Sequence, residues 1–289
     1  MARAEVEELG GSQAVGRRSE ALGGVTEVLA SMLGATLRPG WSAQTMRDGD
    51  VVPPLWHWAA FPQDTPMERL GPDGHPALGA FLPDLGLGRR MWAGGTVTFL
   101  RPIHVGERLT KRSEITDVAW KDAGTGSLAI VSLGHVIAGE DGPAIEETQQ
   151  IVYLAIPEAY RPPKPIPAPQ ETTFDIPITI DGVRLFRYSA ATFNGHKIHY
   201  DRAYAREVEH YPGLIIHGPL QATLLLEQAV AHRGGAVPAR ITHRGVHPMF
   251  EHQPLRLIGL ETGDTMTLCT ATRPEDGGHQ GMQVRAEWA

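Results

Sequence analysis

Two regions of the chain carry regular patterns of apolar residues, with different periods. From 21 to 37 the apolar side chains recur three and four positions apart, as in Val25, Val28 and Leu29, which predicts a helix that ends before Pro39. From 91 to 154, runs such as TVTFL, SLAIVSLGHVI and QQIVYLAI are rich in β-branched residues and are separated by glycine-containing turns. One helix followed by long antiparallel strands predicts an α+β fold in which a sheet curls against a helix.

The same order of elements returns in the second part of the chain. We expect a short strand over 173–180, helices over 181–193, 202–209 and 218–232, and strands over 239–246, 255–260, 265–272 and 282–288. In both parts, a proline begins a strand and a glycine–acid turn follows it, at 99–110 and at 250–267. This similarity between the two parts indicates an internal duplication of one fold.

The boundary between the two parts is the segment 157–169, PEAYRPPKPIPAP. Its six prolines predict a stiff, extended connector. We therefore divide the chain into a flexible lead-in (1–20), an N-terminal domain (21–156), a proline-rich linker (157–172) and a C-terminal domain (173–289). The lead-in carries four glutamates and no apolar core, so we expect neither a secretory signal nor a transit peptide.

Composition narrows the class of protein. The net charge of -7 over 289 residues argues against nucleic acid as the main partner, because neutralising phosphates needs a basic face. No apolar run approaches the ~20 residues of a membrane helix. Cys269 is the single cysteine, which fits a reducing compartment. We expect a cytoplasmic protein that binds neither nucleic acid nor membrane.

Two segments of the first part are candidates for contact with a ligand. The run PPLWHW, with Trp56 and Trp58, is either a core strand or one wall of a ligand cleft, since buried tryptophan serves both. Residues 62–90 are rich in proline and glycine and lack a sustained period. Irregular stretches of this length inside a compact domain are often functional.

The candidate catalytic residues lie between 185 and 218. Gly218 and Pro219 begin a helix that is apolar on most sides and must therefore be buried. Its free N–H groups and positive dipole end form a candidate site for a developing oxyanion, and Gly218 would let a carbonyl oxygen approach the backbone. Taken alone, this feature is better explained as an ordinary buried helix.

His199 is the second candidate functional group. Together with His196 and Asn194 it lies where Asn194-Gly195 breaks a predicted helix, and histidine can transfer protons near neutral pH. A metal site built from His196, His199, Asp201 and His217 ranks below acid–base chemistry, because the first two lie at a helix break. The chain has no GxSxG elbow and no glycine-rich nucleotide loop, so we expect a positioned base and an oxyanion site without a metal or nucleotide cofactor.

These residues resemble a known family. A helix, then TFNGHKIHYD (192–201), a second helix and GLIIHGPLQATLL are similar to the MaoC-like, R-specific hydratase branch of the hot-dog fold. The resemblance implies that His199 is the catalytic histidine and that Gly218 is the backbone oxyanion donor. The family signature, Gly-Asp-x-Asn-Pro-Leu-His, has an aspartate where this chain has Asn194 and a proline where it has Lys197. Asn194 cannot be a base; it could orient the water or the thioester.

A narrower group resembles more of the chain. The runs FNGHKIHYD, PPLWHW, LGPDGHPALGAFLP and RRMWAGGTVTFLRP are similar to double hot-dog enzymes described as 3-methylfumaryl-CoA (mesaconyl-CoA) or itaconyl-CoA hydratases. The resemblance implies two hot-dog domains, each with a long antiparallel sheet around a central helix, and only the second with the catalytic motif. It also implies reversible hydration of a 2-enoyl thioester, with coenzyme A present only as part of the substrate. One chain would then form the two-fold unit internally, and homo-oligomers would assemble from that unit.

Further residues follow from this reading. Arg184, Arg187 and Lys197 are candidates for holding a distal carboxylate or the coenzyme A phosphates, and His196 is a further candidate for substrate binding. Trp56, Trp58 and the segment 62–90 would form the pocket for the acyl tail. Two alternatives stay open: a hot-dog acyl-CoA thioesterase, and a non-catalytic module that binds acyl thioesters.

Overall fold

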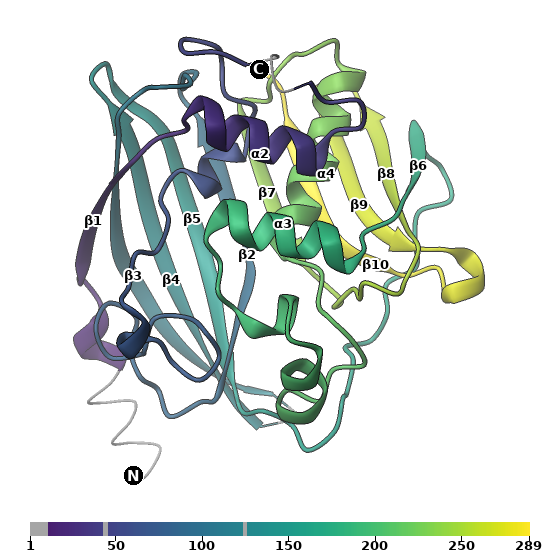
Figure 1. Cartoon of the computed structure of the whole chain (residues 1–289). Helices are drawn as coiled ribbons and strands as arrows, with labels where there is room; N and C mark the ends of the chain where they lie inside the picture. The colour runs from purple at the N-terminus through teal and green to yellow at the C-terminus, as the bar shows by residue number, and fades with distance from the viewer. Residues whose placement is uncertain (1–10, 43–45, 124–125) are drawn as a thin grey trace.

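The strands of both halves join into one antiparallel sheet. The computed structural model describes residues 11–42, 46–123 and 126–289, and its ten strands lie in the order β1-β3-β4-β5-β2-β7-β10-β9-β8-β6 (Figure 1). The first half contributes β1 (Arg18–Gly23), β2 (Arg89–Phe99), β3 (Leu109–Ala123), β4 (Gly126–Gly139) and β5 (Gly142–Leu154). The second contributes β6 (Phe174–Ile178), β7 (Arg240–Gly245), β8 (Leu255–Thr262), β9 (Thr265–Thr272) and β10 (Gln280–Glu287).

The topology of the sheet is an internal repeat. β2 pairs with β7 in the middle of the sheet, with Thr96 opposite Thr242. Outward from this pair, the first half runs β2-β5-β4-β3-β1 and the second runs β7-β10-β9-β8-β6. The strands of the two halves therefore correspond one to one in the sheet. The internal duplication that the sequence predicted is present. The α+β double hot-dog class is confirmed.

Two of the helices are also equivalent in the repeat. α2 (Glu27–Leu37) follows β1, and α3 (Gly182–Thr192) follows β6 after a gap of the same length. Each has a polar N-cap, since the side chain of Thr26 accepts a hydrogen bond from Leu29 N and that of Asp181 accepts one from Arg184 N. The two helices pack against each other.

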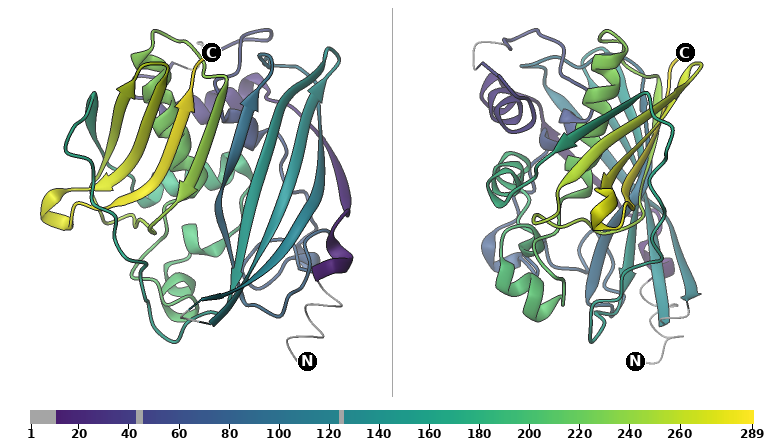
Figure 2. Two further views of the ribbon diagram at one scale, coloured as in Figure 1. Left: turned by 180° about the vertical axis from the view of Figure 1, so that it is seen from behind. Right: turned by 90° about the vertical axis from the view of Figure 1, so that its right-hand side faces the viewer.

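The third helix lies against the sheet of the second half. α4 (Gly218–His232) packs on β8, β9 and β10, and its buried residues include Leu220, Leu224 and Leu225. Figure 2 shows the helices together on one side of the sheet, so that side is the inner face. Within the described residues, no helix has both the length and the apolar character to cross a bilayer.

Among the described residues of the first half, no helix is a counterpart of α4, which corrects the prediction of a central helix in each half. In the structure, the helix predicted over residues 21–37 begins at Glu27. Its equivalent in the second half is α3. The inner face of β3–β5 is covered instead by a 3-10 turn, η3 (Trp56–Ala59), and by apolar residues between 78 and 87 that pack around Ile115, Leu133 and Tyr153. PPLWHW is therefore a turn rather than a core strand, because Leu55 has a left-handed backbone (φ 71).

The lead-in is shorter than predicted. Residues 1–10 lie outside the described residues, but Ser12–Ala14 form a 3-10 turn (η2) and β1 begins at Arg18. β1 is a mostly exposed edge strand, held by main-chain pairing to β3 and by ion pairs from Arg18 to Glu114 and from Arg112 to Glu20. Such a strand needs no apolar alternation, so the pattern of the sequence did not reveal it.

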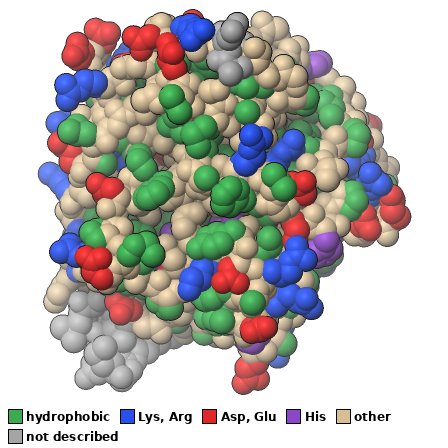
Figure 3. Space-filling view, viewed as in Figure 1, with side chains coloured by type: hydrophobic (Ala, Val, Ile, Leu, Met, Phe, Trp, Pro, Cys, Tyr) green, Lys and Arg blue, Asp and Glu red, His purple; other side chains and the backbone are tan. Residues whose placement is uncertain are grey.

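The proline-rich segment connects β5 to β6 without a helix of its own. It contacts the start of β10, where Gln280 N donates to Ile166 O at 2.8 Å and where Pro167 forms a bridge with His279. The helical face carries exposed apolar side chains on the paired helices α2 and α3 (Figure 3), namely Val28, Met32, Val183 and Phe186. The assembly of the chain into a homo-oligomer stays a prediction.

A row of polar side chains crosses the inner face of the first half. Ser113, His135 and Glu147 stand opposite one another on β3, β4 and β5, and Ser113 Oγ lies 2.8 Å from His135 Nδ1. The buried Glu147 carboxylate accepts a hydrogen bond from Trp58 Nε1 at 2.9 Å and lies 3.3 Å from His57 Nε2. Burial raises the pKa of Glu147, but its interactions with His57 outweigh that effect and lower the pKa to about 2.

Neutralising this carboxylate should destabilise the fold. We expect Glu147→Gln to lower the free energy of unfolding by about 3 kcal/mol near pH 7, because the folded pKa lies well below the unfolded value. The carboxylate contributes stability above the unfolded pKa, and this contribution fades as the pH falls toward about 2. The measurement is urea unfolding of both proteins at about pH 7 and about pH 3.

The exposed Glu114 on β3 supplies the control. Its ion pair with Arg18 is solvent-exposed, so Glu114→Gln should change stability by less than ~1 kcal/mol. The account of Glu147 is wrong if the difference between wild type and Glu147→Gln is the same at both pH values.

Candidate active site

The N-terminus of α4 is in close contact with a tryptophan. The N-cap is His217, Gly218 is the first helical residue and Pro219, which has no N–H, follows. A Cβ on residue 218 would lie 2.7 Å from the Trp92 ring, so only glycine fits there without a shift. Among the residues that the structure describes, none accepts a hydrogen bond from the Gly218 N–H. This N–H, at the positive end of the helix dipole, is free to bind an anionic oxygen.

His199 lies beside this helix end. It closes a short 3-10 turn, η5 (Lys197–His199), and is buried. Its Nδ1 lies 2.8 Å from the carbonyl oxygen of Ile215, a contact in which only Nδ1–H can donate. Nε2 of the neutral ring therefore keeps its lone pair. The His199 ring stacks on that of His217 with centroids 3.6 Å apart, and His217 directly precedes Gly218.

The surroundings keep His199 neutral. Burial lowers the pKa of His199 to about 4; the hydrogen bond to Ile215 opposes the shift and His75 adds to it. At neutral pH the ring is thus the unprotonated form that can accept a proton. The ring that carries this base stacks on His217, the residue directly before Gly218.

His217 is a support for His199. Its side chain is fully buried, with Nε2 2.8 Å from Ser189 Oγ on α3. Burial is the main reason why the pKa of His217 lies well below its usual value, and the neighbouring His199 lowers it further. These contacts make His217 a structural lead-in to α4.

Asn194 shapes the loop that carries the histidines. α3 ends at Phe193, whose backbone is left-handed (φ 51), and Asn194 N then bonds to Ser189 O. The Asn194 Oδ1 accepts a hydrogen bond at 3.0 Å from His196 N, which forms a turn. Oδ1 is therefore engaged within the loop, and the amide Nδ2 is the group left for a water or a substrate.

The irregular segment of the first half reaches this loop. Asp73 O accepts a hydrogen bond at 2.9 Å from Lys197 N, and a Cβ on Gly74 would lie 2.0 Å from Gly195 O. Close backbone contact thus fixes the position of His75. The ring of His75 lies 4.4 Å from that of His196, which lies 5.4 Å from that of His199.

Four imidazoles therefore form a row, His75, His196, His199 and His217, of which the first comes from the other half of the chain. Sequence reasoning missed His75. The only signal was its place in the 62–90 segment, whose irregularity favoured a functional role.

Two arginines on β2 hold the loops in place. Arg90 pairs with Asp73 at 2.8 Å and also contacts the Pro76 carbonyl oxygen. Arg89 is buried and donates to the carboxylate and the main-chain carbonyl of Glu209. β2 thereby joins the 62–90 segment to the chain that leads into α4.

The predicted tryptophans have different surroundings. Trp56 is buried, and its Nε1 bonds at 2.8 Å to Glu227 on α4, so its polar atom is used inside the core. Trp58 lies with its ring edge-on to Trp92 at 5.5 Å, and Trp92 contacts the Gly218 position. Trp58 therefore belongs to the wall beside the helix end.

The predicted cations are engaged with the protein. Arg184 donates to Thr179 O at 3.0 Å, and Arg187 donates to Ala35 O at 3.2 Å, which links α3 to α2. The Lys197 ammonium lies over the Tyr204 ring at 5.1 Å. Their contact with a substrate stays a prediction.

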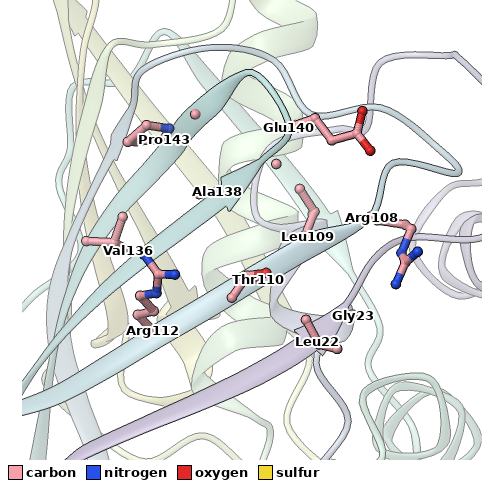
Figure 4. A pocket seen from close by; sticks show the side chains of 12 residues that line it. Leu22, Gly23, Arg108, Leu109, Thr110, Arg112, Val136, Ala138, Glu140 and Pro143 are labelled. Carbon is pink, nitrogen blue, oxygen red and sulfur yellow. The ribbon is translucent and has the colours of Figure 1, made fainter.

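Neither a metal cluster nor the groove on the sheet competes with this site. In the described part of the chain, no three His, Cys, Asp or Glu side chains are grouped so that they could hold a metal ion. A groove of about 520 Å³ is lined by Thr110, Arg112, Val136 and Ala138 (Figure 4). These positions alternate with the buried Ser113, His135 and Ile137, so the groove lies on the outer face of the sheet, away from His199.

A duplicated antiparallel sheet with a central helix whose N-terminus meets a histidine defines the double hot-dog hydratases and dehydratases. The family model described as hydroxyacyl-thioester dehydratase type 2 matches residues 55–251. The chain belongs to this MaoC-like family and is a hydro-lyase.

The individual relatives agree with this assignment. The mesaconyl-C(4)-CoA hydratase of Chloroflexus aurantiacus is 36% identical over 263 residues, which cover 88% of this chain and 90% of the relative. The MaoC-like dehydratase of Phytophthora capsici superposes with a TM-score of 0.67 at 14% identity, over 95% of this chain and 96% of that one. A conserved hypothetical protein of Mycobacterium tuberculosis with a double hot-dog fold gives a TM-score of 0.62 at 13% identity, over 97% and 96% of the two chains.

Proposed function

We propose that the chain catalyses the reversible hydration of a 2-enoyl-CoA thioester, and that the acyl group is a branched C5 dicarboxylic acid such as 3-methylfumaryl or itaconyl. The observation that carries the reaction type is the geometry of His199, whose Nδ1 is bound to Ile215 O while the ring lies against the N-cap residue of α4. The named activity of the Chloroflexus relative supports the acyl group.

Each step of the proposed reaction uses one of these groups. The thioester oxygen binds to the Gly218 N–H, where the helix dipole stabilises the negative charge of the developing enolate. His199 Nε2 removes a proton from water as the water oxygen attacks the β-carbon. The imidazolium then returns a proton to the α-carbon, so the elements of water are added and the enzyme is unchanged. The Asn194 Nδ2 group holds the water.

The first half supplies the rest of the site in this proposal. The catalytic residues belong to the C-terminal domain (173–289), and the linker (157–172) joins it to the domain of residues 21–156. Trp58 and Trp92 form the wall next to the thioester, as their contacts with each other and with the Gly218 position suggest.

An assay that follows the alkene and the thiol together tests the reaction type. With 3-methylfumaryl-CoA and itaconyl-CoA, we expect loss of the alkene and a product heavier by one water, with no free thiol. Release of thiol at the same rate as substrate loss would instead indicate a thioesterase. Binding without any change in alkene or thiol would indicate a non-catalytic acyl-binding module, and either result would refute the proposal.

A further inference from the structure

We propose that His75 and His196 together bind a carboxylate on the β-carbon of the substrate, so that the pair selects dicarboxylic enoyl thioesters. This inference rests on the function proposed above. The centroids of the two rings lie 4.4 Å apart, and the His196 ring also contacts that of His199. One comes from the first half of the chain and one from the second.

The nitrogens of both rings are free to take a ligand. Within the described part of the chain, nothing hydrogen-bonds to the ring nitrogens of His75 or His196, and the hydrogen bonds of both residues run through their main-chain groups. His196 is only 6% exposed, and its ring nitrogens are not among the fully buried polar atoms that lack a partner. Polar atoms in such a place bind water, which a ligand can replace.

The positions of the two rings are fixed before any ligand binds. The Lys197–Asp73 main-chain bond and the close approach of Gly74 to Gly195 hold the two loops together, and Arg90 anchors Asp73 from β2. A binding pair held in this way loses little conformational entropy when a ligand arrives.

Both rings are neutral near pH 7. Burial is the main reason why the pKa of His196 lies well below its usual value, and His75, His199, Arg90 and Arg89 lower it further. At His75, burial and Arg90 lower the pKa to about 4 against the weaker effect of Asp73. The two neutral rings each carry one N–H donor, and two such donors can bind a carboxylate.

The chemistry of the substrate class places a carboxylate in this position. In 3-methylfumaryl-CoA the second carboxylate is attached to the β-carbon, the atom that the water attacks. A water bound to His199 Nε2 lies roughly 3 Å from that nitrogen, so the carboxylate of the attacked carbon must lie close to His199. The His196 ring, 5.4 Å from that of His199, is within reach of that carboxylate.

Removing the donor of His75 while keeping the ring tests the inference. For His75→Phe we expect KM for 3-methylfumaryl-CoA to rise about 10- to 100-fold, the loss typical of a hydrogen bond to a charged group. Turnover of crotonyl-CoA, which lacks the carboxylate, should stay within about 3-fold of wild type. His75→Gln, which restores an N–H donor, should recover part of the loss, and His252→Phe at an exposed position should change neither substrate.

The outcomes separate this inference from the function itself. Equal losses on both substrates, or no loss on either, would show that His75 does not read the carboxylate, and the hydratase assignment would stand. A wild-type enzyme that hydrates crotonyl-CoA but not 3-methylfumaryl-CoA would overturn the inference and the proposed 3-methylfumaryl group, and the hydration of an enoyl thioester would stand. A wild-type enzyme that hydrates neither thioester would overturn both.

Discussion

Replacement of His199 by glutamine is expected to reduce hydration of the enoyl thioester by about 10³-fold in kcat, since a positioned general base contributes on this order. Glutamine has a similar length and can still donate to Ile215 O, so the loop should keep its shape. The measurement is the rate of alkene loss at saturating thioester, with the unfolding midpoint as a check of the fold.

His252→Gln is the matched control for this experiment. The His252 side chain is largely exposed and lies outside the histidine row, so its replacement should leave kcat unchanged. Turnover of His199→Gln within about tenfold of wild type would contradict the assignment of the base.

The pH profile of the wild-type enzyme provides a second readout of the same base. Because the pKa of His199 is lowered to about 4, the neutral ring persists well below the usual titration range of histidine. On the acid side, kcat/KM should therefore decrease as the pH falls through about 4, where this base becomes protonated. An acid limb centred near ~6.5 that disappears in His199→Gln would contradict the burial argument.

Separating the two halves is expected to abolish activity. Residues 173–289 alone would expose the edge of β7 that pairs with β2 and would lose Trp92 beside Gly218 and His75 beside His196. α4 would also lose the bonds of Glu227 to Arg38 and Trp56. We expect the loss of turnover to exceed about 10³-fold, because a displaced wall misplaces the thioester as well as the base.

The control for this experiment is co-expression of the two pieces. A cut within the linker, between 172 and 173, leaves every strand and helix whole. Residues 1–172 and 173–289 produced together should recover turnover to within about tenfold of the intact chain, since the β2–β7 contact re-forms the site. An active C-terminal fragment would show that the first half is dispensable.

Local patterns were sufficient to predict the elements of the second half. The bounds of α4 agree with the prediction because Pro219 marks its first turn and an unbroken apolar run follows. The longer strands follow from their β-branched content. The duplication itself is confirmed by the sheet topology, but the glycine–acid turns that suggested it are not equivalent. Gly106-Glu107 precedes β3, whereas Gly263-Asp264 follows β8, the strand equivalent to β3.

The parts that sequence did not reveal depend on contacts between distant residues. β1 is an exposed edge strand, so its pairing with β3 leaves no apolar pattern. The equivalence of α2 with α3 rather than with α4 becomes visible only once the strand order is known. His75 lies far along the chain from His196, and no local spacing connects the two residues.

The catalytic roles given to His199 and Gly218 stay predictions, and the sequence did not reveal the residues that support them. His199 and Gly218 were identified from a broken helix and a glycine–proline helix start, and the structure brings them together through His217. The ring of Trp92 leaves room only for glycine at position 218, and Trp92 belongs to a strand of the other half. A tryptophan within a strand pattern is usually part of the core, so nothing local distinguished it.

One measurement tests the central claim most directly: turnover of 3-methylfumaryl-CoA in water labelled with ¹⁸O, by wild type and by His199→Gln, with the products analysed by mass. The account predicts that wild type places one labelled oxygen on the β-carbon of an intact thioester, and that His199→Gln forms almost none of this product. Label found instead in a free carboxylic acid released from coenzyme A, or equal labelling of the thioester by both proteins, would contradict it.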